Sequence, residues 1–84
     1  MKQVKVEVVS QQGTCAYNHK VGDTWICGPT TPCGVCASAY VAVYPTIRAL
    51  AAGGKFDWGN ADGSVDLCCP DHLNPLVLRL TPVE

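Results

Sequence analysis

The chain of 84 residues carries six Lys and Arg against seven Asp and Glu, and 48% of its residues are hydrophobic. This length predicts a single domain over residues 1–84, since domains typically contain ~100–150 residues. The balanced charge excludes the clustered basic surface that binds nucleic acid, and the apolar content excludes a disordered tail. No apolar run approaches the ~20 residues of a membrane span, and the start of the chain lacks a signal-peptide core. We therefore expect a cytoplasmic protein with no membrane partner.

Charge and cysteine content are both unusual. Charged residues make up 15% of the chain, whereas ~25% is usual for soluble domains. We therefore expect self-association or a larger partner subunit to cover part of the surface. In a compartment that keeps thiols reduced, the six cysteines indicate metal or redox chemistry rather than structural disulfides. A bound metal can also supplement the small core of so short a domain.

The first half of the chain predicts two strands and a helix. Apolar and polar residues alternate from Val4 to Val9, which is typical of a half-buried strand. A second short strand is expected over 24–27, followed by a rigid connection rich in Gly and Pro over 28–32. Apolar residues recur at spacings of three and four over 34–52, which predicts a helix. Pro45 lies inside this helix and should kink or split it.

The second half predicts a loop over 55–66 and a final strand that begins near Leu76. Antiparallel pairing of this strand with the first one would tie the two ends of the chain together. The order strand, strand, helix, strand predicts an α+β fold, in which one kinked helix packs on a small antiparallel sheet.

A C-x-x-C motif, formed by Cys33 and Cys36, stands at the expected start of the helix. Its spacing brings two sulfurs within reach of one metal ion or of each other. A helix N-terminus favours the thiolate form that either role requires. A thiol–disulfide redox protein is therefore one interpretation, with Cys68 or Cys69 as the resolving cysteine. The alternative is that Cys36 is simply a buried apolar residue beside an incidental Cys33.

Two further segments carry candidate ligands. Cys69 precedes Pro70, and a Cys followed by Pro closes the ligand run of bacterial ferredoxins. Its neighbour Cys68 should point the other way, because side chains alternate along an extended chain. Cys15 lies in a turn-rich segment and is a third candidate. His19, four residues later, is a fourth ligand, a proton donor at an open metal site, or a solvated loop residue.

Segments 13–15, 18–23, 36–40, 44–45, 53–54 and 69–71 together form a pattern of short motifs. It contains C-x-x-G-H-K-x-G-D, G-x-C-x-x-A, a proline inside the helix, G-G, a Trp and C-P-D. In this combination, over nearly its whole length, the chain resembles a family of small uncharacterised prokaryotic proteins. It departs from the pattern at Asn18, where the family has Gly, and at Asp57, where Pro is common. The residues of this chain that the resemblance matches to the family's motifs are Cys15, His19, Gly22, Asp23, Cys36, Gly53, Gly54, Trp58, Cys69, Pro70 and Asp71.

The resemblance implies a core of three cysteines, with Cys27, Cys33 and Cys68 as extras. Cys27 ends a predicted strand and has no metal-ligand spacing, so we interpret it as a core residue. The resemblance does not name a reaction, and whether the protein is an enzyme stays open.

Three thiolates from separate segments suit an iron–sulfur cluster, of which [4Fe–4S] is the preferred candidate, with one iron left open. They also suit a zinc site closed by His19, since structural zinc is four-coordinate. Scattered cysteines favour the cluster, so we predict an iron–sulfur protein with three ligands, Cys15, Cys36 and Cys69, and Cys33 as a further candidate.

An open iron would act as a Lewis acid in lyase-type chemistry, with His19 or Asp71 moving the proton. If Cys33 fills the fourth position, the cluster would only carry electrons or hold the fold. The alternatives are a zinc-stabilised interaction module and the thiol–disulfide protein.

Overall fold

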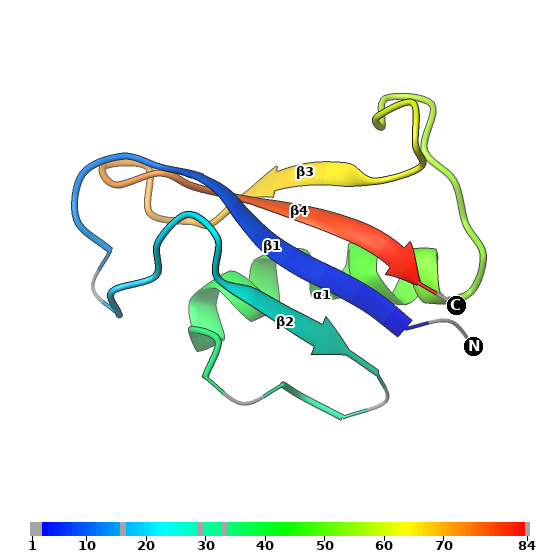
Figure 1. Cartoon of the computed structure of the whole chain (residues 1–84), viewed down its shortest axis with the longest axis horizontal. Coiled ribbons are helices and arrows are strands. Elements are labelled where there is room, and N and C mark those ends of the chain that lie inside the picture. Colours follow the sequence, from blue (N-terminus) through cyan, green and yellow to red (C-terminus); the bar gives the residue numbers. More distant parts are fainter. Residues whose placement is uncertain (1–2, 16, 29, 33, 84) are drawn as a thin grey trace.

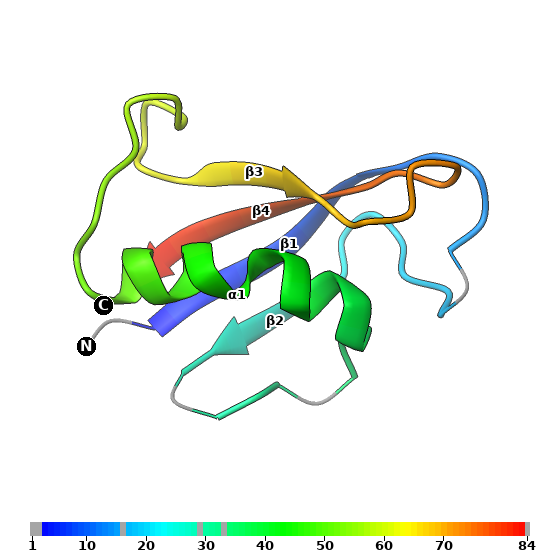
Figure 2. The ribbon, with the colours of Figure 1, turned by 180° about the vertical axis from the view of Figure 1, so that it is seen from behind.

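The computed structural model describes residues 3–15, 17–28, 30–32 and 34–83. Its elements are β1 (Gln3–Gln11), β2 (Thr24–Cys27), α1 (Ala37–Ala51), β3 (Val65–Cys68) and β4 (Leu76–Val83). The strands form one sheet in the order β2-β1-β4-β3, and each neighbouring pair is antiparallel. Figures 1 and 2 show α1 lying across one face of this sheet. The predicted α+β fold, with a helix packed on an antiparallel sheet, is confirmed.

The core lies between α1 and the two central strands. The apolar positions of the predicted first and last strands alternate as expected and are buried towards the helix. The pairing of β1 with β4, which runs from Gln3 opposite Val83 to Gln11 opposite Leu76, joins the two ends of the chain as predicted. The buried apolar side chains of these two strands are Val4, Val6, Val8, Leu76, Leu78 and Leu80, and α1 adds Ala39, Val43, Ile47, Leu50 and Ala51.

The helix is shorter than predicted at its start. Gly34 has a φ of +92° and Cys36 a ψ of 132°, so neither residue is helical and α1 begins at Ala37. Pro45 does not split α1. The carbonyl that lacks a partner because of Pro45 belongs to Val41, which is 71% exposed, so water can reach this side of the helix. Within the described ranges, no helix has both the length and the hydropathy to cross a membrane.

The predicted loop over 55–66 extends too far, because β3 begins at Val65. Val65 is buried and Leu67 half-buried, while Asp66 and Cys68 are exposed. This alternation lets β3 add to the edge of β4. With only four residues, the strand is too short for its period to stand out from the preceding polar loop.

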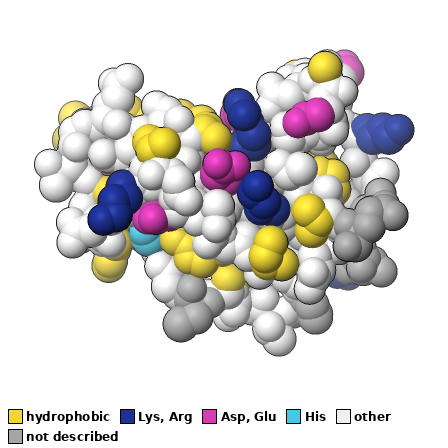
Figure 3. Space-filling view, in the orientation of Figure 1, with side chains coloured by type: hydrophobic (Ala, Val, Ile, Leu, Met, Phe, Trp, Pro, Cys, Tyr) yellow, Lys and Arg dark blue, Asp and Glu magenta, His cyan; other side chains and the backbone are white. Residues whose placement is uncertain are grey.

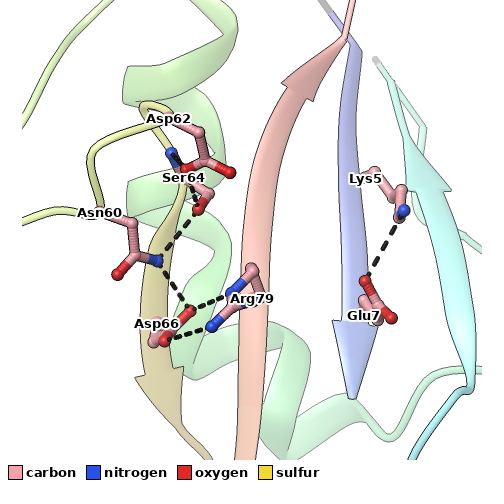
Figure 4. A network of polar contacts seen from close by, with 7 residues as sticks. All are labelled: Lys5, Glu7, Asn60, Asp62, Ser64, Asp66 and Arg79. Carbon is pink, nitrogen blue, oxygen red and sulfur yellow. Dashed lines mark hydrogen bonds and ion pairs between the residues drawn. The ribbon is translucent and has the colours of Figure 1, made fainter. Parts of the chain in front are cut away.

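The other face of the sheet is not covered by α1, and it carries charges of both signs across its middle (Figure 3). Lys5 Nζ lies 3.6 Å from Glu7 Oε1. Arg79 Nε donates to Asp66 Oδ1 at 2.9 Å, across the paired strands β4 and β3. Figure 4 shows how Asn60 extends this network towards Ser64. The Arg79–Asp66 pair, which joins directly opposite residues of β4 and β3, supports the register of the short edge strand.

Replacing Asp66 with Asn should remove an acid-sensitive contribution to stability. Hydrogen bonding to the Arg79 guanidinium is the main cause that holds the pKa of Asp66 below its usual range. The contribution is therefore fully present above the unfolded-state pKa of about 3.9 and is lost as the pH falls through the lower folded-state pKa. We expect urea midpoints of D66N below wild type near neutral pH but converging with it in acid. An equal deficit at both pH values would contradict this account.

Candidate functional site

A pocket of about 160 Å³ lies where three segments meet at one end of the sheet. These segments are the β1–β2 connection, the start of α1 and the β3–β4 connection (Figures 1 and 2). For comparison, a cavity of about 150 Å³ holds one benzene molecule. The pocket is lined by the three predicted cysteines and both predicted proton carriers, together with other residues: Cys15, Tyr17, His19, Cys36, Ser38, Ala39, Cys69, Pro70, Asp71, Asn74 and Leu76.

Cys36 is the N-cap residue of α1. Its carbonyl oxygen accepts a hydrogen bond from Tyr40 N at 2.9 Å, and its amide nitrogen donates to His19 Nε2 at 3.0 Å. Among the described residues, no side-chain capping hydrogen bond is present at Cys36, and no acidic residue occurs in the first turn of α1. The free N–H groups and the positive end of the helix dipole therefore lie beside the pocket, where they favour negative charge.

His19 is only 7% exposed, which excludes the interpretation of a solvated loop residue. Its ring packs edge-on against Trp25, with 5.0 Å between the ring centroids. The backbone before it is unusual, because Asn18 has a φ of +60°. Asn tolerates this left-handed conformation better than most residues other than Gly. The turn thus places the His19 side chain in the interior, although the neighbouring loop residues are exposed.

Asn74 joins the segments that carry Cys15 and Cys69. Its Oδ1 accepts a hydrogen bond from Thr14 N at 2.9 Å, between residues 60 positions apart, and its Nδ2 donates to Asp71 Oδ2 at 3.1 Å. The interpretation from the sequence overlooked Asn74, because a contact over such a separation leaves no local signal.

Gly13 makes this junction possible. It has a φ of +71°, and a Cβ atom there would overlap with Asn74 Oδ1. A non-glycine residue in a left-handed conformation costs about 1 kcal/mol of stability. We expect Gly13→Ala to lower the free energy of unfolding by more than this amount, because the added Cβ also meets Asn74. Gly63→Ala is the matched control, because Gly63 has a φ of +89° but open space around its Cβ position. Chemical denaturation of both variants measures the difference, and equal losses would contradict the proposed close approach.

Asp71 lies at the exposed side of the pocket. Its carboxylate accepts hydrogen bonds from Leu73 N and from the Asn74 amide. The bond from Asn74 is the main cause that lowers the pKa of Asp71. Asp71 is therefore ionised near neutral pH, so it can accept a proton but holds none to donate.

The remaining cysteines separate by environment. Cys27 is 2% exposed within the core, and burial raises the pKa of its thiol. This position agrees with its interpretation as a core residue. Cys68 is exposed, whereas the neighbouring Cys69 is half-buried and lines the pocket. Cys33 lies outside the described residues. The described cysteines are all free thiols: Cys15, Cys27, Cys36, Cys68 and Cys69.

The pocket is lined in part by residues that can supply soft donor atoms. Three cysteines from separate segments line it, and thiolates select iron–sulfur clusters, zinc or copper(I) over magnesium and calcium. Within the described part of the chain, no three His, Cys, Asp or Glu side chains are grouped closely enough to hold one metal ion.

Comparison of the chain with protein-family models gives no match, and neither the curated proteins nor the solved structures yield a similar protein.

Proposed function

We propose that this protein binds an iron–sulfur cluster, preferably [4Fe–4S], through Cys15, Cys36 and Cys69. The observation that carries the proposal is their common position around one pocket, although the three cysteines come from distant parts of the sequence. Cluster ligands in proteins are mostly Cys thiolates. The pocket walls include apolar side chains such as Ala39 and Leu76, which would limit solvent access to the cluster.

The start of α1 supports the proposal electrostatically. Three thiolates bring negative charge into a half-buried space, and such charge is costly unless it is compensated. The uncapped N-terminus of α1, at Cys36, offers backbone N–H groups and no competing acidic side chain. Among the described residues, no Lys or Arg lines the pocket. The N-terminus of α1 is therefore the group in this part of the chain that compensates the negative charge of the thiolates.

A zinc site closed by His19 is the weaker alternative. Such a site needs four donors around one ion at tetrahedral geometry. The described residues contain no such group, and His19 Nε2 already accepts the Cys36 amide. A zinc-stabilised interaction module would therefore require movement of the His19 ring.

The role of the cluster depends on its fourth ligand. With an open iron, the bound cluster would supply a Lewis acid for a hydroxyl or carboxylate substrate, and the ionised Asp71 at the exposed side of the pocket would accept the proton. With Cys33 as fourth ligand, the cluster would carry electrons or hold the fold. Cys33→Ser separates the two roles: full cluster retention in this variant favours the open iron, and loss of the cluster favours four cysteine ligands.

Thiol–disulfide exchange by Cys33 and Cys36 is the competing function. The free thiols at Cys36, Cys68 and Cys69 are compatible with it, but exchange gives no reason for Cys15 to line the same pocket. Metal-free protein that reduces a disulfide substrate would favour this alternative.

Analysis of iron, zinc and acid-labile sulfide in protein purified without oxygen tests the proposed function. We expect brown protein with iron and sulfide in equal amounts. Colourless protein with stoichiometric zinc would replace the proposal with the zinc module, and metal-free protein that reduces a disulfide substrate would replace it with the redox function.

We also propose that the protein acts in the cytoplasm and associates with itself or a larger subunit, with no nucleic acid as partner. Large apolar side chains support the association: Leu73 is 76% exposed, Val41 71% and Tyr17 68%. Light scattering of the purified protein would measure its mass in solution.

A further inference from the structure

The hydrogen bond between Cys36 and His19 defines the protonation of the histidine ring. Cys36 N lies 3.0 Å from His19 Nε2. A backbone amide can only donate a hydrogen bond, so Nε2 must accept it and carries no proton. While this bond is present, the lone pair of Nε2 is not available to a metal ion, and Nε2 has no proton to give.

The ring that accepts this bond is fixed to the sheet. It also contacts Trp25, whose ring is turned by 72° relative to that of His19. Trp25 belongs to β2 and pairs with Val6 of the central strand β1. Directly after His19, the turn is closed by the Asp23 carboxylate, which accepts a hydrogen bond from Lys20 N at 3.0 Å. His19 therefore provides a fixed point to which the start of α1 is attached.

Cys36 is thereby fixed at both of its backbone groups. Its N–H bonds to His19, and its carbonyl accepts the N–H of Tyr40 at 2.9 Å. The resulting φ of −59° and ψ of 132° determine the direction of its Cα–Cβ bond. Since Cys36 lines the pocket, this direction decides where one of the three thiols is presented.

We propose that His19 is a positioning residue, which holds Cys36 in place through Nε2 and uses this nitrogen neither as a cluster ligand nor as a proton donor. This inference rests on the proposed function, because it describes how one of the proposed cluster ligands, Cys36, is held in position. The hydrogen bond itself belongs to the protein without any bound group. It can therefore be tested in both the cluster-free and the cluster-bound protein.

Three variants separate positioning from the other roles. His19→Gln keeps an acceptor oxygen near the place of Nε2, whereas His19→Leu keeps volume and removes the acceptor. His72→Leu is the control, because His72 is exposed and does not line the pocket. Two readouts are measured on each: hydrogen exchange of the Cys36 amide in cluster-free protein, and the rate of iron loss to a chelator after reconstitution with iron and sulfide.

We expect His19→Leu to accelerate exchange of the Cys36 amide about fivefold, as the loss of one hydrogen bond implies. Iron loss should become about 10-fold faster, as is usual when a group that orients a ligand is removed. His19→Gln should restore most of both values, and His72→Leu should equal wild type. If folded His19→Gln fails as badly as His19→Leu, a role specific to the imidazole replaces positioning. If His19→Leu changes neither readout, the inference is wrong.

Two measurements keep the outcome clear when a variant or the proposed function fails. If His19→Leu does not fold, the ¹⁵N spectrum of the wild-type histidine rings decides: Nε2 of His19 should be unprotonated and Nδ1 protonated, and the reverse tautomer would overturn the inference. If no cluster assembles, the proposed function fails, while amide exchange of Cys36 still tests the positioning bond by itself.

Discussion

Replacement of Cys15, Cys36 or Cys69 by serine is expected to abolish cluster retention in each single variant. The reason is geometric, because each cysteine lines the pocket from a different segment and the other two cannot move into its place. A serine oxygen is also a much poorer ligand for iron–sulfur clusters than a thiolate. Iron and sulfide content after anaerobic purification measures the effect, and we expect each variant to retain less than about one tenth of the wild-type content.

The chain offers two matched controls for this series. Cys68→Ser changes the residue next to Cys69 at an exposed position, and Cys27→Ser changes a thiol buried in the core. Neither residue lines the pocket, so both variants should keep the cluster, although Cys27→Ser will lower stability because it buries a hydroxyl. Equal cluster loss in all five variants would contradict the assignment of the ligands.

Leu78→Ala is expected to cause the largest loss of stability among single core substitutions. Leu78 is fully buried on the central strand β4, where it pairs with Val8 on one side and Leu67 on the other. Its truncation removes buried apolar surface and leaves a cavity, which typically costs about 2–5 kcal/mol. Because stabilities of only about 5–15 kcal/mol are usual, this variant should be close to unfolding.

Urea denaturation measures the loss, and Leu73→Ala is its control. Leu73 is 76% exposed, so the same chemical change should alter the free energy of unfolding by less than about 0.5 kcal/mol. Similar losses for the two leucines would show that β4 is not the centre of the core.

The fold was largely predictable because its main elements have clear periods. Alternation in β1 and β4 and the three- and four-residue spacing in α1 reflect burial on one face of each element. β3 was missed because four residues carry too little alternation. The early start of the predicted helix has another cause: Gly34 adopts a left-handed conformation, and only the tertiary setting of that turn shows it.

The cysteine candidates could also be chosen from the sequence, but not the contacts that orient them. Spacing and the Cys-Pro pair pointed to Cys36 and Cys69, and the structure places both at the pocket with Cys15. The hydrogen bonds made by His19 and Asn74 join residues 17 and 60 positions apart. Such bonds depend on the folded geometry of several loops, so no local pattern reveals them. The resemblance to a protein family stays a prediction.

The account depends on one group being held jointly by thiols from three distant segments. Differential alkylation tests this most directly: each cysteine is quantified by peptide mass spectrometry after brief treatment with iodoacetamide, before and after removal of the cluster by a chelator. We predict that Cys15, Cys36 and Cys69 are protected together and become reactive together, while the exposed Cys68 reacts in both states. Protection that differs among the three, or that is unchanged by the chelator, would contradict the account.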